Sequence, residues 1–250
     1  MCDRRKLLFG SIRCMPYLER DGDVHILFLG AQNGTDNPEN RFHPDWIDAV
    51  HALLDEVEAA AGPAALVTTA TGKFFSNGVD LSWGAENLDQ VNRFIDTMQA
   101  LLTRVLTFPM QTVAALQGHT FGGAAFFAMA HDYRIMRADR GYLCFPGVTI
   151  GASYSPGTVA LAAAKLAPHD FSEALTTGRR FGGADAMTHG LVDDTTPLDQ
   201  LRDKAIARAH ELSATRGKVL GDIKRTMYAD VVDSLLTPVA GVEDQEWSSR

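Results

Sequence analysis

Residues 112–132 read TVAALQGHTFGGAAFFAMAHD: an apolar run, a turn containing glycine, and a helix of small residues. Residues 66–81 read LVTTATGKFFSNGVDL and follow the same plan of buried strand, glycine turn and helix. Such a turn can leave backbone N–H groups pointing into a cavity, and a helix N-terminus adds a partial positive charge. Two N–H groups that converge on one point form an oxyanion hole, and glycine keeps the approach open. Either turn alone is most simply an ordinary connection between a strand and a helix. The two turns together are what indicates an oxyanion hole.

The composition is that of an ordinary globular protein, and it disfavours several classes of function. The chain has 250 residues, of which 46% are hydrophobic and 22% charged, and its formal net charge is −8. An acidic chain lacks the basic face that nucleic-acid or anionic-membrane binding needs, and no apolar run reaches ~18 residues. The three cysteines show no CxxC spacing, which disfavours a disulfide framework or a zinc site. We therefore expect no nucleic-acid partner, no membrane span, and a cytoplasmic location (peroxisomal in a eukaryote).

Strand-like and helix-like segments alternate along most of the chain. A β-hairpin is expected within residues 6–30, with its turn at ERDGD. Strands are expected at residues 64–70, 111–118, 133–139 and 141–146, and helices at residues 43–62, 90–106 and 122–132. After Pro156 the pattern is mostly helical. The alternation predicts an α/β fold with parallel strands, in which residues 1–195 form the core and residues 196–250 a helical region of the same structural unit.

Four segments together resemble the crotonase (enoyl-CoA hydratase/isomerase) superfamily, over residues 6–236. They are RFHPDW (41–46), KFFSNGVDL (73–81), ALQGHTFGGAAFFAMAHDYRIM (115–136) and VTIG (148–151). The first two are most similar to the Δ3,Δ2-enoyl-CoA isomerases. The resemblance implies a crotonase fold, which is a spiral of repeated ββα units with a helical C-terminal region for trimerisation. It also implies an acyl-CoA thioester as partner, a homotrimer or dimer of trimers, and no cofactor beyond the coenzyme A of the substrate.

The resemblance also implies a set of site residues. The thioester oxygen is expected between the backbone N–H groups of Val79 and Gly123, which would form the oxyanion hole. Phe126 stands where hydratases have their first glutamate, and it faces the acyl pocket with an apolar ring. The groove for coenzyme A is expected along the first turn, at Ser76, Asn77, Gly78, Asp80 and Leu81, with Asp80 holding the turn.

One acid of the family is missing. The alignment on VTIG places the second glutamate, which the isomerases use to carry a proton between two carbons, at Gly147. No Asp or Glu lies between Gly141 and Ala167. Enolate chemistry needs a base near the α-carbon as well as an oxyanion hole, so we expect the base to be altered or impaired. Replacing Gly147 by glutamate is expected to create or raise isomerase activity.

Three functions remain open. The favoured one is an isomerase-like enzyme of fatty-acid metabolism that moves a double bond from Δ3 to Δ2 through a thioester enolate. The second is a non-catalytic acyl-CoA binder or regulator. The third is enolate chemistry with a bound anion such as bicarbonate as the base, as in the dihydroxynaphthoyl-CoA synthases of this superfamily. Candidate bases on the helix after the first turn, each more simply a solvated position, are Glu86, Asp89 and Asp96. The side chains that flank the gap are expected to pack in the core: Tyr142, Cys144 and Tyr154.

The remaining polar residues are not expected to carry the chemistry. His43, His119 and His131 lie on three different elements without an HxxxH or HExxH pattern, so no metal site is expected. His119 lies in the second turn, where it could border the thioester. Ser153 and Ser155 are not part of a GxSxG elbow, and neither glycine turn has a nucleotide-binding spacing. Three basic residues could contact the phosphates of coenzyme A, with a solvated position the simpler expectation: Arg41, Lys224 and Arg225.

Overall fold

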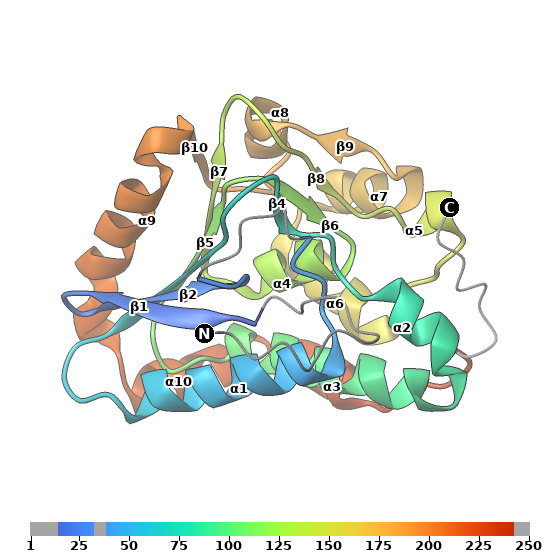
Figure 1. Cartoon of the computed structure of the whole chain (residues 1–250), viewed down its shortest axis with the longest axis horizontal. Helices are drawn as coiled ribbons and strands as arrows, with labels where there is room; N and C mark the ends of the chain where they lie inside the picture. The colour runs from blue at the N-terminus through green and yellow to red at the C-terminus, as the bar shows by residue number, and fades with distance from the viewer. Residues whose placement is uncertain (1–14, 33–38, 243–250) are drawn as a thin grey trace, which may run out of the picture.

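A six-stranded sheet forms the centre of the fold. The computed structural model describes residues 15–32 and 39–242, and Figure 1 shows the sheet with helices on both sides. The strand order is β1-β2-β3-β5-β7-β10, antiparallel between β1 and β2 and parallel elsewhere. Its strands are β1 Tyr17–Asp21, β2 Val24–Phe28, β3 Ala65–Thr69, β5 Thr112–Leu116, β7 Tyr133–Arg137 and β10 Asp194–Thr196. The expected hairpin and the parallel α/β class are confirmed, while residues 6–14 of the hairpin segment lie outside the described residues.

A second, smaller sheet arises because one unit repeats along the chain. Its order is β4-β6-β8-β9, with β4 Phe74–Ser76, β6 His119–Phe121, β8 Leu143–Cys144 and β9 Arg180–Phe181. In three successive units the first strand (β3, β5, β7) joins the large sheet and the second (β4, β6, β8) joins the small sheet, and a helix follows. This is the expected spiral of ββα units, and it places the corresponding turns of successive units next to one another.

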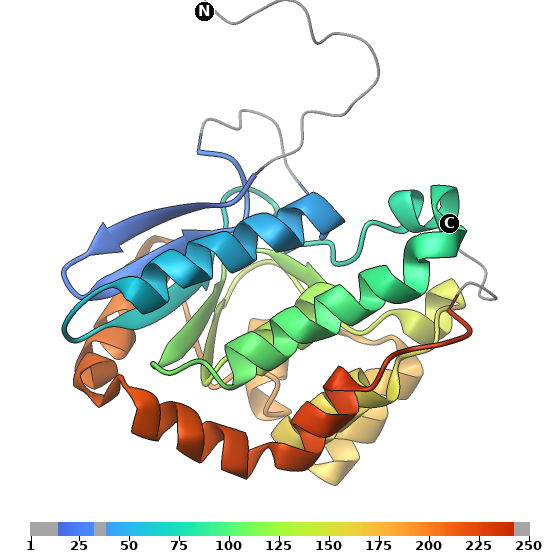
Figure 2. The ribbon, with the colours of Figure 1, turned by 90° about the horizontal axis from the view of Figure 1, so that it is seen from below.

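Helices cover both faces of the large sheet. On one face, α9 (Leu198–Leu212) packs Leu201, Ala205 and Ala209 against side chains of β2, β3, β5 and β7. The other face is covered by α1 (Pro44–Ala59), α3 (Val91–Leu106) and α4 (Gly123–Ala130), and α1 and α3 run side by side in Figure 2. The remaining helices are α2 Leu81–Glu86, α5 Gly147–Ile150, α6 Pro156–Lys165, α7 Pro168–Thr177, α8 Gly183–Thr188, α10 Lys218–Met227 and α11 Ala229–Leu236. Among the described helices, none combines the length and apolarity that a membrane crossing requires.

The segment just before α1 positions the first glycine turn. Phe42 forms a parallel bridge with Val79: its N–H donates to Gly78 O at 2.7 Å, and its carbonyl accepts the Asp80 N–H at 2.8 Å. The Phe42 ring is fully buried and stacks on Trp46 of α1, with ring centroids 4.4 Å apart. The packing of α1 in the core therefore holds the backbone on both sides of Val79.

Some short elements differ from what the sequence pattern predicts. The stretch 141–151 reads as a strand that runs into a turn, but only Leu143–Cys144 is strand, and α5 follows, closed by Gly151 at φ +75°. The strands β9 and β10 have two and three residues, too few to give a visible alternation of side chains. β10 spans the expected boundary between residues 195 and 196, and it attaches this part of the chain to the large sheet by pairing with β7. The division of the chain there stays a prediction.

A buried ion pair holds α10 to the core. Lys224 is only 4% exposed, and its Nζ lies 2.5 Å from Asp132 Oδ2 and donates to Met110 O at 2.8 Å. Burial lowers the pKa of Lys224, and the neighbouring Asp132 opposes that shift. The expectations for Lys224, a solvated position or a phosphate contact, are therefore wrong, because the ammonium group is committed to Asp132.

Candidate functional site

The first glycine turn follows β4 and lies directly against the second. Gly78 has φ +79°, and a Cβ there would lie 2.5 Å from Phe121 O and 2.8 Å from Gly123 N. Only glycine allows this approach, because any side chain would push the two turns apart. The buried Ser76 braces the turn: its Oγ accepts the Gly78 N–H at 3.0 Å and donates to Asn40 O at 2.7 Å.

The residues on either side of Gly78 hold the turn in the same way. The Asn77 N–H donates to Glu39 O at 2.7 Å, and its side-chain amide donates to the Glu39 carboxylate at 3.1 Å. Asp80 Oδ1 accepts the Ser82 N–H at 3.2 Å and so caps α2, which begins at Leu81. The role expected for Asp80, holding the turn, agrees with these contacts.

Val79 and Gly123, which carry the two expected N–H donors, lie against each other. A Cβ on Gly123 would lie 3.4 Å from Val79 N and 3.1 Å from Val79 Cγ2. Within the described residues neither N–H donates to an acceptor of the protein, whereas the N–H groups of Gly78 and Asp80 are both used. Gly123 is the first residue of α4, where the helix dipole contributes a partial positive charge. Two adjacent donors at a helix N-terminus are the arrangement that stabilises an oxyanion.

The wall beside these two donors is apolar. Phe126 lies one turn into α4, is 3% exposed, and packs its ring against Phe145 and Tyr154 at centroid distances of 4.8 and 5.1 Å. From the α3 side, Met98 Cε lies 3.1 Å from the position of a Cβ on Gly123. The wall therefore excludes water and offers no carboxylate to hold one.

Tyr154 fills the space beside Gly147. A Cβ on Gly147 would lie 2.5 Å from Tyr154 Cζ and 2.7 Å from Tyr154 Oη, and it would also meet the carbonyl of Ala152. The Gly147 N–H donates to Tyr154 Oη at 2.5 Å. Burial raises the pKa of Tyr154 to about 12, although the bond from Gly147 acts in the opposite direction, so the phenol is neutral. A phenol group therefore stands where the alignment places the glutamate side chain.

The sequence pattern predicts only core packing for Tyr154, because it does not reveal how the chain returns. The short helix α5 and the left-handed Gly151 turn the chain so that residue 154 faces residue 147. The interpretation of residues 141–151 as a strand and a turn hides this return. The sequence does contain one signal for this contact: the glycine at the expected acid position is followed seven residues later by a tyrosine.

A sequence model described as enoyl-CoA hydratase/isomerase matches residues 35–245. The chain belongs to the enoyl-CoA hydratase/isomerase family. The enoyl-CoA delta isomerase 3 of Arabidopsis thaliana is 33% identical over 224 residues, which cover 86% of this chain and 92% of that protein. The crystal structure of human mitochondrial delta3-delta2-enoyl-CoA isomerase is similar with a TM-score of 0.80 at 19% identity, covering 89% of this chain and 86% of that chain. The structure of an enoyl-CoA isomerase of Mycobacterium tuberculosis is similar with a TM-score of 0.82 at 20% identity, and the similarity covers 92% of this chain and 97% of that chain. The crotonase fold and the similarity to isomerases are thereby confirmed.

The three acids that the sequence offers as substitute bases do not lie beside Gly147. Glu86 and Asp89 are exposed, as expected for solvated positions. Asp96 is half-buried, and its Oδ1 accepts the Val239 N–H at 2.9 Å. This bond ties the segment after α11 to α3. None of the three contacts Gly147 or Tyr154.

The histidines do not form a metal site. His43 caps α1, and His131 is fully buried, with its ring nitrogens hydrogen-bonded to Phe127 O at 2.8 Å and Thr68 Oγ1 at 2.9 Å. Burial lowers the pKa of His131 to about 4, so it is neutral. In the described parts of the chain, no group of three or more His, Cys, Asp or Glu side chains could hold a metal ion. His119 begins β6, whereas Gly123 follows the end of that strand, so the two residues lie at opposite ends of β6.

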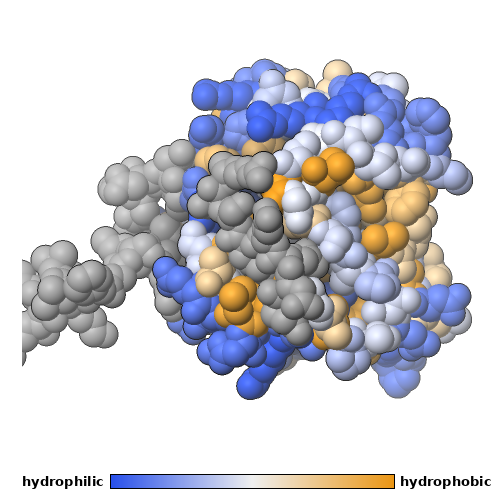
Figure 3. All heavy atoms as spheres, turned by 90° about the vertical axis from the view of Figure 1, so that its right-hand side faces the viewer, coloured by the Kyte–Doolittle hydropathy of each residue, from blue (hydrophilic) through white to orange (hydrophobic). Residues whose placement is uncertain are grey.

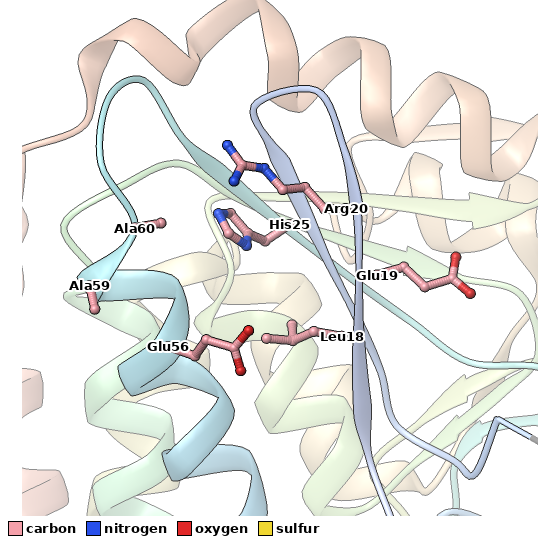
Figure 4. A pocket seen from close by; sticks show the side chains of 7 residues that line it. All are labelled: Leu18, Glu19, Arg20, His25, Glu56, Ala59 and Ala60. Atoms are coloured by element: carbon pink, nitrogen blue, oxygen red, sulfur yellow. The ribbon is translucent and has the colours of Figure 1, made fainter.

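Two further surface features are a cavity and an area of exposed apolar side chains. A cavity of about 400 Å³ lies between the β1–β2 hairpin and the end of α1, where His25 points between Arg20 and Glu56 (Figure 4). It contains no residue of either glycine turn. Apolar side chains reach the surface on the side that carries α2 and α5 (Figure 3). Leu88, which follows α2, and Val148 in α5 are both exposed.

Gly78→Ala is expected to destabilise the fold by about 2 kcal/mol more than Gly62→Ala, because a Cβ at residue 78 meets backbone atoms of the second turn. Gly62 is the matched control, since its φ of +83° is similar and nothing lies within 4 Å of an added Cβ. Urea unfolding measures the difference. Equal losses in the two variants would contradict the close contact of the turns.

Gly147→Glu is expected to destabilise the fold and not to raise isomerase activity. This corrects the expectation drawn from the alignment, because the glutamate Cβ would collide with Tyr154 and with the Ala152 carbonyl. The double variant Gly147→Glu, Tyr154→Ala opens the space taken by the ring and serves as the comparison. Higher turnover in the single variant, measured with 3-enoyl-CoA, would mean that Tyr154 moves aside at little cost.

Proposed function

We propose that the chain binds acyl-CoA thioesters between the two glycine turns and shifts a double bond from C3 to C2 through a thioester enolate. The observation that carries this proposal is the close approach of Val79 to Gly123 at the N-terminus of α4, with neither N–H group bonded to an acceptor within the described residues. A thioester oxygen that accepts both N–H groups would be stabilised most strongly when it gains negative charge in the enolate. The family and the names of the similar proteins support this substrate class.

The apolar wall supports isomerisation over hydration. Hydration requires polar groups that hold and activate a water molecule, and the position of the first hydratase glutamate is occupied by the buried Phe126. The rings of Phe145 and Tyr154 complete that wall. A double-bond shift needs no water, because it only moves a proton from C2 to C4.

Tyr154 is the group that we assign to proton transfer. One proton must leave C2 to form the dienolate, and one must reach C4. The Tyr154 oxygen accepts the Gly147 N–H, so its own proton remains available for donation toward carbon. To balance the reaction, the phenolate form of Tyr154 would accept the C2 proton, and the phenol so formed would donate that proton to C4. With a pKa raised to about 12, the phenolate is rare near neutral pH, so the phenol is well placed to donate to the dienolate but its base form is scarce. We therefore expect turnover lower than with a carboxylate base, by about 10²-fold or more.

A non-catalytic acyl-CoA binder is the second candidate, and the same neutral phenol favours it. If Tyr154 accepts no proton from C2, the two N–H groups would still bind the thioester. The third candidate, a bound anion acting as the base beside Gly147, has little support, because the Tyr154 ring occupies that space.

An assay with a 3-enoyl-CoA separates the two candidates. Formation of the 2-enoyl-CoA is followed by absorbance, and the affinity for the thioester is measured by calorimetry. Slow turnover together with binding is expected. Binding without turnover would favour the second candidate, and failure to bind would contradict both.

Tyr154→Phe in the same assay is the sharper variant, because it keeps the ring against Phe126 and removes only the hydroxyl. Turnover is expected to fall about 10-fold or more while the thioester affinity is retained. Tyr17→Phe, which lies in β1, is the control and is expected to change neither. If Tyr154→Phe turns over as fast as the unchanged chain, the proton comes from another group.

We also infer that the C-terminal helices form a contact between subunits, giving a homotrimer or a dimer of trimers. Large apolar side chains are exposed on α10 and α11, with Val219 72% exposed, and the others are Ile223, Met227 and Leu236. Contact with another subunit would bury this apolar surface. Sedimentation is expected to give an oligomer for the unchanged chain and a smaller species for Ile223→Asp. A monomer of the unchanged chain would contradict the inference.

A further inference from the structure

A second cavity lies at the opposite end of β4 and β6 from the two N–H groups. Its volume is about 160 Å³, and its lining includes Lys73, His119, Arg137 and Arg140. Lys73 directly precedes β4 and His119 begins β6, whereas Val79 and Gly123 follow the ends of those strands. The cavity is therefore separated from the candidate thioester site by the length of the small sheet.

The cavity is built by the spiral itself. Its walls are the turns between the first and second strands of three successive ββα units, after β3, β5 and β7. These turns are in contact: a Cβ on Gly118 would collide with Lys73 O, and a Cβ on Gly141 would lie 3.0 Å from the carbonyl carbon of Gly118. The His119 N–H also donates to Lys73 O at 2.9 Å. The cationic side chains are thus carried on a backbone that packing holds in place.

The lining is cationic although the whole chain has a net charge of −8. Each of the three turns contributes: Lys73 the first, His119 the second, and Arg137 with Arg140 the third. Arg137 pairs with Asp139 at 2.7 Å and also donates to Gln117 O, whereas Arg140 is exposed. No acid belongs to the lining itself. Like charges gathered at one point repel one another, and an anion among them would remove that cost.

A second, independent observation that points to a ligand concerns His119. Its Nδ1 is buried and has no hydrogen-bond partner among the described residues. A buried polar atom without a partner calls for an explanation such as a ligand. The ring lies among Phe74, Phe121 and Tyr142, at centroid distances of 5.3, 5.1 and 5.5 Å. Burial lowers the pKa of His119, and the cations of Lys73, Arg180 and Arg140 add to the shift, so the ring is neutral without an anion.

We propose that this cavity binds a phosphate-class oxyanion, at a site separate from the thioester site. The ammonium group from the first turn and the guanidinium groups from the third can each donate to a different oxygen, which suits a tetrahedral oxyanion better than a single-point anion such as chloride. A bound phosphate would raise the pKa of His119, and the imidazole would take up a proton and become a further donor. The phosphate could be inorganic phosphate or the terminal phosphate of a phosphomonoester.

Calorimetry of the full chain with inorganic phosphate at constant ionic strength tests the proposal, without any thioester present. Saturable binding of one phosphate per chain is expected, and Arg140→Gln and Lys73→Gln are each expected to weaken it about 10-fold. Arg93→Gln is the matched control, because Arg93 is an exposed arginine on α3 and the change in net charge is the same. An equal loss in the control, or no saturable binding, would overturn the proposal.

Three further measurements define the site. In the carbon–proton NMR spectrum, the His119 ring signal is expected to shift with phosphate and to titrate at higher pH when phosphate is bound, and an unmoved signal would contradict the role of His119. Titration with a phosphomonoester, such as glycerol phosphate, distinguishes the two sources by relative affinity. Repeating the phosphate titration with the chain saturated by an acyl-pantetheine thioester, which has no phosphate of its own, is expected to leave the affinity unchanged. Competition there would overturn the separation of the two sites, whereas a failure of the isomerase assay would leave the phosphate result standing.

Discussion

The close approach of the Gly78 turn to the N-terminus of α4 is the constraint on which the rest of the site depends. One added carbon at Gly78 would collide with backbone atoms of the second turn. The turns meet because β4 and β6 pair in parallel, and because Asn40 donates to the carbonyls of Phe74 and Phe75 at 3.1 and 3.0 Å. The position of the two N–H donors is thus set by the packing of the two turns and by the hydrogen bonds of the Asn40 side chain.

Because the donors belong to the backbone, the site can keep its affinity for an oxyanion while its proton chemistry changes. Gly147 lacks the carboxylate, and the space that its missing side chain leaves is taken by Tyr154. The two features depend on each other: a side chain at residue 147 would expel the ring, and loss of the ring would leave a hole against Phe126. A return to a carboxylate at this place therefore requires at least two substitutions, which explains why the alignment alone misjudges Gly147→Glu.

The α/β class with parallel strands could be predicted from the residues alone, because the alternation of strand-like and helix-like segments is a local pattern. The two strand–glycine–helix segments are local as well, but the spiral and the places of Val79 and Gly123 follow from the resemblance to the crotonase superfamily, and the roles of these two residues stay a prediction. The contact between Gly147 and Tyr154 depends instead on the left-handed conformation of Gly151, which reverses the chain. The periodicity of the sequence does not encode the resulting approach of the Tyr154 ring to Gly147. Lys224 was missed for the same reason, since its partner Asp132 lies 92 residues away in the chain.

The repeated unit also explains why positive potential gathers at both ends of the small sheet. After β4 and β6 the chain turns into helices, and the potential comes from unpaired N–H groups and the α4 dipole. Before β4, β6 and β8 the chain turns between two sheets, and the potential comes from side chains carried on stacked turns. Backbone donors stay in place when side chains change, whereas a cluster of cations persists only if something offsets its repulsion. Asp139 offsets Arg137, and Lys73 lies 5.2 Å over the Phe74 ring, but the buried Nδ1 of His119 has no hydrogen-bond partner in the part of the chain that the structure describes. An anion supplied from outside would satisfy that atom and the excess charge together.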